Sequence, residues 1–436
     1  MGWLVAAVLA FGLQDDKKEM EALKQRMAEI EKRMAEKEGK APQEPKAPDG
    51  SLPQAAQDSK RDAGEIYSKS FLKRFGRNVY LGGYMDLEFF HTEGRNNDTF
   101  DQHRFVPFIY ADVSDHIKVA AEIEIEHGNG TELGIEFAQI DYWIAPYINF
   151  RAGIILDPLG HYNLVHDAPF KDLTTRPLVD EVIVPVVLRE PGIGFFGSFG
   201  AGSWEFDYEV YLVHGFKGLN NAGVTTINTS NGTRNARPHV GTPAGFGSAY
   251  RDFNDDKSVV GRFSASPFLG LEVGVSAHTG MYDFRGDNRM TISVLDLTMN
   301  LGGVMNQLGA TADIWSSFEF LGEYARANIQ RDAFARASGV PDDLDGFYVE
   351  GRYHFMPDFL REIIPGANEE STFTLVFRLD KVDLDGFKRR QYVPGLNFRL
   401  REDTVFKFEY LFRREPGTRS TNVENDQFVF SVATYF

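Results

Sequence analysis

Apolar and polar residues alternate along most of this chain, from near Arg77 to the last residue. Between Ile117 and Glu126 the odd positions are apolar or small, and most of the even positions are acidic. The same alternation runs from Phe406 to Arg413 and from Phe428 to Phe436. Because successive side chains of a β-strand point to opposite faces, this period of two predicts amphipathic strands.

About sixteen such strands can be counted, which is an even number, as in bacterial outer-membrane barrels. The segment from Met290 to Leu301 could form a further strand, and this would break the even count unless another strand were merged. The expected strands are centred near residues 84, 108, 121, 139, 152, 196, 208, 262, 275, 309, 322, 351, 376, 395, 409 and 431.

The connections alternate in length, with tight turns at one end of the strands and long polar loops at the other, which is typical of an outer-membrane barrel. Met356 to Glu370 departs from this rule, because it lies on the side of the tight turns yet is long and has the apolar spacing of a helix. The expected turns are 114–115, 146–147, 200–203, 267–270, 314–316 and 401–403, and the expected loops are 91–102, 157–191, 214–257, 283–303, 330–345 and 415–426.

A soluble sandwich or propeller is the alternative, since amphipathic strands build those folds too. Strands in such folds are about 5 or 6 residues long, whereas many runs here reach the roughly 9 to 11 residues that a tilted membrane-spanning strand needs. Aromatic residues also gather near strand ends, as at Phe89 and Phe90 and at Tyr142 and Trp143, where interfacial girdles would lie. We therefore predict an all-β transmembrane antiparallel β-barrel over residues 77–436, located in the bacterial outer membrane.

The first 76 residues have a different character. Residues 1–12 are apolar and end in small residues, which predicts a signal peptide, although no basic residue precedes Lys17. Met20, Leu23, Met27, Ile30 and Met34 then follow a spacing of 3 and 4, which predicts a short coiled-coil helix over 13–38. A solvated charged helix is the alternative for this segment. Residues 39–76 are rich in Pro, Ala and charge up to Gly64, and we expect a linker there.

Composition narrows the class of protein further. Hydrophobic residues make up 42% of the 436 residues, and no run of about 18 apolar residues occurs, so a membrane-spanning helix is not expected. The chain has no Cys, which excludes disulfides and thiolate metal sites. It also lacks a G-x-S-x-G elbow, an H-E-x-x-H helix, a phosphate-binding loop and a basic patch with interleaved aromatics. We therefore expect no enzyme, no cofactor, no metal and no nucleic-acid partner.

Three segments resemble the phosphate-selective porin O and P family. Arg151 to Gly160 (RAGIILDPLG) is a strand that runs through a Pro-x-Gly turn into a long loop, and Ser371 to Asp380 (STFTLVFRLD) and the final strand ending in Phe436 are similar to that family too. The resemblance covers roughly residues 77–436. It implies a sixteen-stranded barrel, a homotrimer and a pore narrowed by the third outer loop.

The third long loop, residues 157–191, carries charges of both signs and is the segment expected to determine which solutes pass. The alternative is an outer cap that never enters the pore. The residues predicted at the constriction are Arg151, Lys171, Arg176, Asp180, Glu181 and Arg189, and those predicted to face the lumen are Glu122, Glu124, Arg262, Arg378, Arg399, Lys407 and Glu409.

The sequence does not decide which solute the channel prefers. From Arg77 onward acidic residues outnumber basic ones by 50 to 32, which argues against anions such as phosphate without excluding them. We expect passive diffusion of small polar or charged solutes through a porin in contact with outer-membrane lipid. A structural anchor, in which the N-terminal helix reaches from the barrel into the periplasm, is the alternative function. On the porin interpretation the same helix would be a zipper that holds three barrels together.

Overall fold

The computed structural model describes residues 73–75, 78–94, 98–127, 132–185, 187–220, 223–224, 254–310, 313–414 and 425–436. The chain divides into two units, Met1–Ser51 and Leu52–Phe436, and every described residue belongs to the second. The predicted signal peptide, the predicted coiled coil and most of the predicted linker lie outside the described residues and stay predictions.

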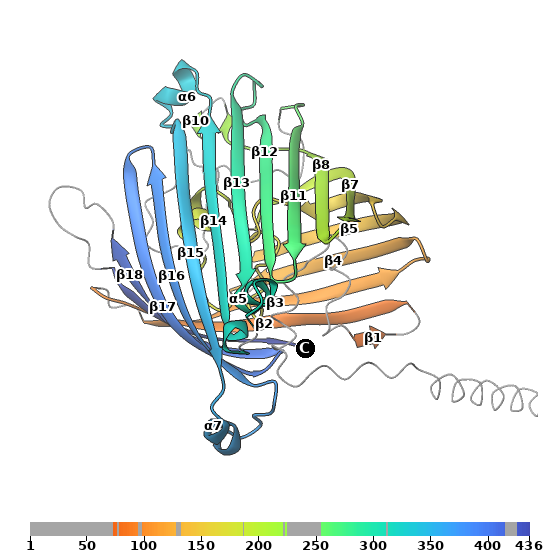
Figure 1. Cartoon of the computed structure of the whole chain (residues 1–436). Coiled ribbons are helices and arrows are strands. Elements are labelled where there is room, and N and C mark those ends of the chain that lie inside the picture. Colours follow the sequence, from red (N-terminus) through yellow and green to blue (C-terminus); the bar gives the residue numbers. More distant parts are fainter. Residues whose placement is uncertain are drawn as a thin grey trace, which may run out of the picture. The chain divides into compact units, whose positions relative to one another are not determined.

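Sixteen long strands form a closed antiparallel barrel, which confirms the predicted fold (Figure 1). Each strand pairs with its neighbour in sequence, and the last strand closes the barrel by pairing with β2 from Gln427↔Thr92 to Tyr435↔Tyr84. The strands are β2 (Val79–Thr92), β3 (Thr99–Asp112), β4 (Ile117–Glu126), β5 (Glu132–Ala145), β6 (Ile148–Leu156), β7 (Arg189–Ala201), β8 (Trp204–Val213), β11 (Ser258–Phe268), β12 (Leu271–Met281), β13 (Arg289–Asn300), β14 (Phe318–Ile329), β15 (Asp343–Phe355), β16 (Thr372–Leu384), β17 (Phe387–Arg401), β18 (Thr404–Arg414) and β19 (Gln427–Tyr435).

Short elements occupy the strand edges and the connections. β1 (Lys73–Phe75) pairs with the first residues of β2, so strand pairing begins four residues before the boundary we predicted at Arg77. No helix among the described residues is long and apolar enough to cross a membrane. The other short elements are α3 (Leu178–Val182), β9 (Leu219–Asn220), β10 (Gly223–Val224), α5 (Leu301–Gln307), η2 (Asp313–Ser317), α6 (Ala333–Ala337) and α7 (Asp358–Ile363).

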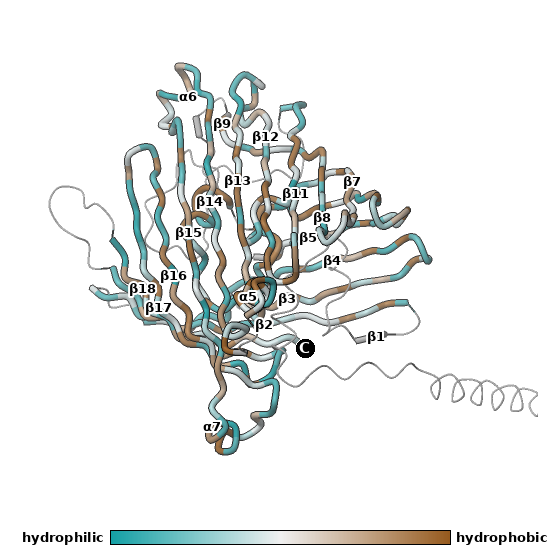
Figure 2. Tube along the Cα trace, in the orientation of Figure 1, coloured by the Kyte–Doolittle hydropathy of each residue, from teal (hydrophilic) through white to brown (hydrophobic). Residues whose placement is uncertain are grey.

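The outer face of the barrel is apolar. Apolar and polar residues alternate along the strands (Figure 2), and large side chains such as Ile140 and Phe377 are 54% and 53% exposed. Near the turn end of β14 to β17, aromatic rings stack side by side from strand to strand, with centroids 4.5 to 5.7 Å apart, among Phe318, Tyr353, Phe355, Phe373 and Phe398. This exterior suits lipid with an aromatic girdle at one interface, as expected in the bacterial outer membrane.

One predicted strand was wrong. Residue 309 lies in the connection between β13 and β14, which contains α5 and η2, and the strand itself is β13 at Arg289–Asn300. β13 directs Met290 and Ile292 inward, where they are buried, and leaves Leu295 and Leu297 exposed on the outer face. The apolar residues face inward as far as Val294 and outward from Leu295, so the alternation changes phase within the strand and does not mark one apolar face, as it does in the others. β13 replaces the predicted strand, so the count stays even.

Two connections on opposite ends break the rule of alternating lengths. The helix expected within Met356 to Glu370 is present as α7. β16 and β17 are joined at the loop end by a turn of two residues, Asp385 and Gly386, whose φ angles are 54° and 91°. An Asp-Gly pair with both φ angles positive is favoured in such hairpin turns, so local turn chemistry decides the length of this connection.

Candidate functional site

The connection between β6 and β7, residues 157–188, folds into the barrel, and we name it the inner loop. Its backbone meets inward-facing side chains from strands far apart around the wall. The Gly160 N–H donates to Ser276 Oγ on β12 at 2.8 Å, and Lys407 Nζ on β18 donates to the Ala168 carbonyl at 2.6 Å. Since β12 and β18 lie on different parts of the barrel wall, the inner loop crosses the lumen.

Three basic side chains of the wall hold the middle of the inner loop. Arg399 donates to the carbonyl oxygens of Pro169 and Phe170 at 2.6 and 2.8 Å. Arg378 donates to the carbonyl oxygens of the loop at Thr175 and Arg176, at 2.8 and 3.1 Å. The lumen-facing predictions Arg378, Arg399 and Lys407 therefore point inward, but each is buried under the loop. Their part in permeation stays a prediction.

Acidic groups complete the attachment. Glu409, another predicted lumen residue, accepts hydrogen bonds from the backbone N–H groups of Thr174 and Thr175, both at 2.9 Å. Asp172 of the inner loop lies 3.0 Å from Arg352 and 3.1 Å from Arg399. Burial by itself would raise the pKa of Asp172, but the two guanidinium groups outweigh it and hold that pKa well below its usual range.

The helix α3 rests on an apolar part of the wall. Its Leu178, Val179 and Val182 are buried in one cluster with Met290 and Ile292 of β13. The inward apolar residues of β13 therefore face the inner loop rather than water, which explains the unusual pattern of that strand.

Two predicted constriction residues of the inner loop are enclosed. Asp180 is fully buried in α3, where burial and the nearby Glu323 raise the pKa of its carboxyl group well above the usual range. Lys171 is also buried, with its Nζ 3.4 Å from the Thr174 carbonyl, and burial lowers its pKa well below the ordinary value. Glu181, by contrast, is half-buried.

Other predicted residues form ion pairs within the wall. Arg151 makes two hydrogen bonds to Asp141, at 2.8 and 2.9 Å, and its guanidinium lies 4.4 Å from the centre of the Phe196 ring. Arg262 binds both oxygens of Asp296 at 2.8 Å, and Glu122 accepts a 2.7 Å hydrogen bond from Tyr110. These side chains point into the barrel and are at least nine-tenths buried.

Charged residues from the inner loop, the start of β7 and the β3–β4 wall gather in a group that we name the passage cluster: Arg104, Glu124, Glu126, Arg189, Arg176 and His103. Arg104, Glu124 and Glu126 are buried, whereas Arg176, Arg189 and His103 keep part of their surface exposed. Arg104 Nε lies 3.2 Å from both Glu124 and Glu126. Arg189 lies 3.6 Å from Glu124, and Arg176 is close enough to interact electrostatically with both carboxylates. Arg189 keeps 17% of its side chain exposed and His103 keeps 22%. The structure thus brings together the predicted residues Arg176, Arg189 and Glu124.

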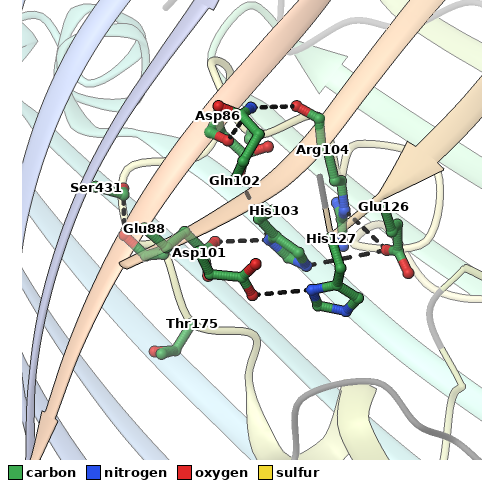
Figure 3. Close-up of polar contacts among 12 residues, drawn as sticks. Asp86, Glu88, Asp101, Gln102, His103, Arg104, Glu126, His127, Thr175 and Ser431 are labelled. Carbon is green, nitrogen blue, oxygen red and sulfur yellow. Dashed lines mark hydrogen bonds and ion pairs between the residues drawn. The ribbon is translucent and has the colours of Figure 1, made fainter. Parts of the chain in front are cut away.

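Sequence analysis missed the histidines of this wall (Figure 3). The β2–β3 ladder shifts register between Asp86 and Glu88, so His103 turns inward beside Arg104. His103 Nδ1 then lies 2.8 Å from Glu88 and 3.4 Å from Asp86, and His127 next to it lies 2.9 Å from Asp101. A bulge that re-aims a side chain leaves no mark in a period-two pattern.

A second bulge does the same for β5. The β4–β5 ladder shifts between Glu122 and Ile123, and Glu136 and Phe137 are both buried as a result. Glu136 binds the Nε2 atom of His166 in the inner loop. The bulge therefore adds another attachment point for the inner loop, on β5.

The comparisons support the fold. No family model matches the sequence. An uncharacterised protein of Aquifex aeolicus (strain VF5) is 24% identical over 294 residues, which cover 65% of this chain and 63% of that protein, so the match spans less than two thirds of the relative. The anion-selective porin from Comamonas acidovorans has a similar structure, with a TM-score of 0.52 at 12% identity, covering 82% of this chain and 99% of that one. A loop-deletion mutant of OmpT, an outer membrane protein of Vibrio cholerae, gives 0.48 at 10% identity, covering 82% and 99%. The chain has a porin-type barrel.

Proposed function

We propose that this protein is an outer-membrane porin, through which small polar or charged solutes diffuse past the inner loop. The observation that carries the proposal is the passage cluster. Its charges come from the inner loop at Arg176, from the start of β7 at Arg189 and from the β3–β4 wall, and solvent reaches its Arg189 and His103. Opposed charges across a narrow opening set up a transverse field that orders water and solutes.

The passage cluster contains both acidic and basic side chains, and this favours a channel with only a weak preference between cations and anions. Selection of phosphate needs several Arg or Lys residues that converge on one constriction without competing carboxylates. Arg378, Arg399 and Lys407 bind the inner loop instead. A second candidate, passage of anions such as phosphate, is favoured by the convergence of three guanidinium groups, those of Arg104, Arg176 and Arg189, around the single carboxylate of Glu124.

Single-channel conductance in a planar bilayer with a salt gradient tests both candidates. We expect discrete conductance steps. Neutralising the wall carboxylates in a Glu124→Gln, Glu126→Gln variant should shift the reversal potential toward anions, and an Arg176→Gln, Arg189→Gln variant should shift it toward cations. Arg390→Gln is the matched control, because Arg390 is exposed on the outward face of β17. Block of the chloride current by phosphate would favour the second candidate.

Absence of conductance in the wild type would overturn the porin proposal and favour the structural anchor.

We also propose that the porin is a homotrimer whose residues 13–64 act as a zipper. Deleting those residues should weaken the oligomer in crosslinking experiments and leave the conductance of each barrel unchanged. A conductance lost with the deletion would contradict the zipper.

A further inference from the structure

Three ionisable side chains meet at the base of the inner loop, away from the passage cluster. Asp157 is the first residue of the loop, Glu190 follows its end in β7, and His278 comes from β12. Oxygen and nitrogen atoms of the three lie within 4.8 Å of one another. His278 Nε2 is 2.9 Å from Glu190 Oε2 and 4.0 Å from Asp157 Oδ2.

This group is buried and incompletely satisfied. Asp157 and Glu190 are 0% exposed and His278 is 1% exposed. Among the described residues no N–H or hydroxyl group donates to either carboxylate oxygen of Asp157 or to Glu190 Oε1, and His278 Nδ1 has no partner. The carboxyl groups of Asp157 and Glu190 instead lie against each other. Carboxylates withdrawn from water are costly unless a cation or hydrogen bonds compensate them. In this group a single imidazole lies beside two carboxylates.

We propose that Asp157, Glu190 and His278 bind one divalent transition-metal ion, with Zn²⁺ as the best match. One imidazole nitrogen and two carboxylate oxygens are a donor set that zinc accepts, whereas Ca²⁺ and Mg²⁺ prefer oxygen alone. Zinc bonds of about 2.0–2.2 Å in a tetrahedron place ligand atoms roughly 3.3 Å apart. The observed separations of 2.9 and 4.0 Å lie on either side of that value.

Neighbouring side chains hold the three ligands in place. The side-chain amide of Asn163 donates to the Asp157 and Leu188 carbonyls at 2.7 and 2.9 Å, and its oxygen accepts from the Leu188 N–H at 2.8 Å. The Phe216 ring packs edge-on against His278, with centroids 4.8 Å apart. The ion therefore ties both ends of the inner loop to the wall at β12.

Another acid and histidine group provides a matched control. Asp86, Glu88 and His103 also lie within ligand distance of one another. They differ because His103 is partly exposed and because Arg104 supplies positive charge close by. A zinc ion is therefore not needed there, and His103→Gln should leave zinc binding unchanged.

The test uses the full-length, tag-free protein, stripped with a chelator and titrated with Zn²⁺ alone. We expect one Zn²⁺ per chain by elemental analysis and an unfolding temperature that rises with Zn²⁺ concentration. Asp157→Asn, Glu190→Gln and His278→Gln should each weaken zinc binding by about tenfold or more, the scale on which perturbing a metal site acts.

Equal zinc affinity in the wild type and in Glu190→Gln would overturn the proposal. Should Asp157→Asn fail to fold, Glu190→Gln keeps the shape of the site and still decides the question. Zinc content and unfolding are measured without any current, so their outcome is independent of whether the barrel conducts.

Discussion

At the residue scale, the inner loop depends on a few buried polar contacts. Arg399 is the clearest of these, because its guanidinium donates to three backbone carbonyl groups and to Asp172 at distances of 2.6 to 3.4 Å. Removing one partner of a buried pair leaves the other group uncompensated, and this costs more than the pair itself contributes.

Arg399→Gln should lower the free energy of unfolding by about 3–5 kcal/mol. The reason is that the carbonyls of Pro169 and Phe170 lose their donor and that Asp172 keeps only one of its two guanidinium partners, Arg352. Chemical unfolding of the barrel in lipid vesicles measures this change. Arg390→Gln, on the outward face of the same strand, should stay near the wild type, and an equal loss in both variants would contradict the assigned role of Arg399.

Two buried carboxyl groups of the inner loop should respond to pH with opposite signs. Asp172 has a lowered pKa, so its contribution is present above the ordinary value near pH 4 and is lost as the pH falls below it. Asp180 has a raised pKa, so its neutral form favours the folded state and stability falls as the pH rises above about 4.

The comparison of Asp172→Asn with Asp180→Asn measures both effects. Relative to the wild type, Asp172→Asn should lose stability at pH 7, with a difference that shrinks below about pH 4. Asp180→Asn should gain relative stability as the pH rises from about 5 to 8. Unfolding free energies at several pH values test this, and parallel pH profiles for the two variants would contradict the assignment.

At the scale of the element, α3 and the strands beneath it act as one unit. Val179 is fully buried in one apolar cluster with inward residues of β13, β14 and β15, and α3 itself packs against β15 and β16. Because this contact is apolar, its strength depends on keeping water and charge out of the cluster.

Val179→Asp should detach the inner loop and enlarge the single-channel conductance, because an unpaired charge in this cluster costs more than about 3 kcal/mol. Cleavage of the inner loop by an added protease should also become faster. Phe359→Asp is the matched control, since Phe359 lies in the short helix α7 and is 63% exposed. An unchanged conductance in Val179→Asp would show that the loop does not limit permeation.

At the scale of the whole barrel, the outward residues determine how the described part of the chain meets lipid. Phe377 is 53% exposed on the outer face of β16, with neighbours that are also apolar, such as Leu375. Phe377→Arg should destabilise the barrel in vesicles by about 2–4 kcal/mol. Lys381→Ala, nearer the loop end of the same face, should cost little. Equal effects in detergent and lipid would count against a lipid-facing position.

The period of two by itself determined the fold class and the face to which Glu122 and Glu124 belong, because side-chain direction in a strand depends on local geometry alone. Only the tertiary structure decided that β13 at Arg289–Asn300 is a strand, since its inward residues are apolar to match α3. It also decided the bulges that turn His103 and Glu136 inward, and which basic side chains bind the inner loop. Each of these depends on contacts between residues distant in sequence, and a one-dimensional pattern does not record such contacts.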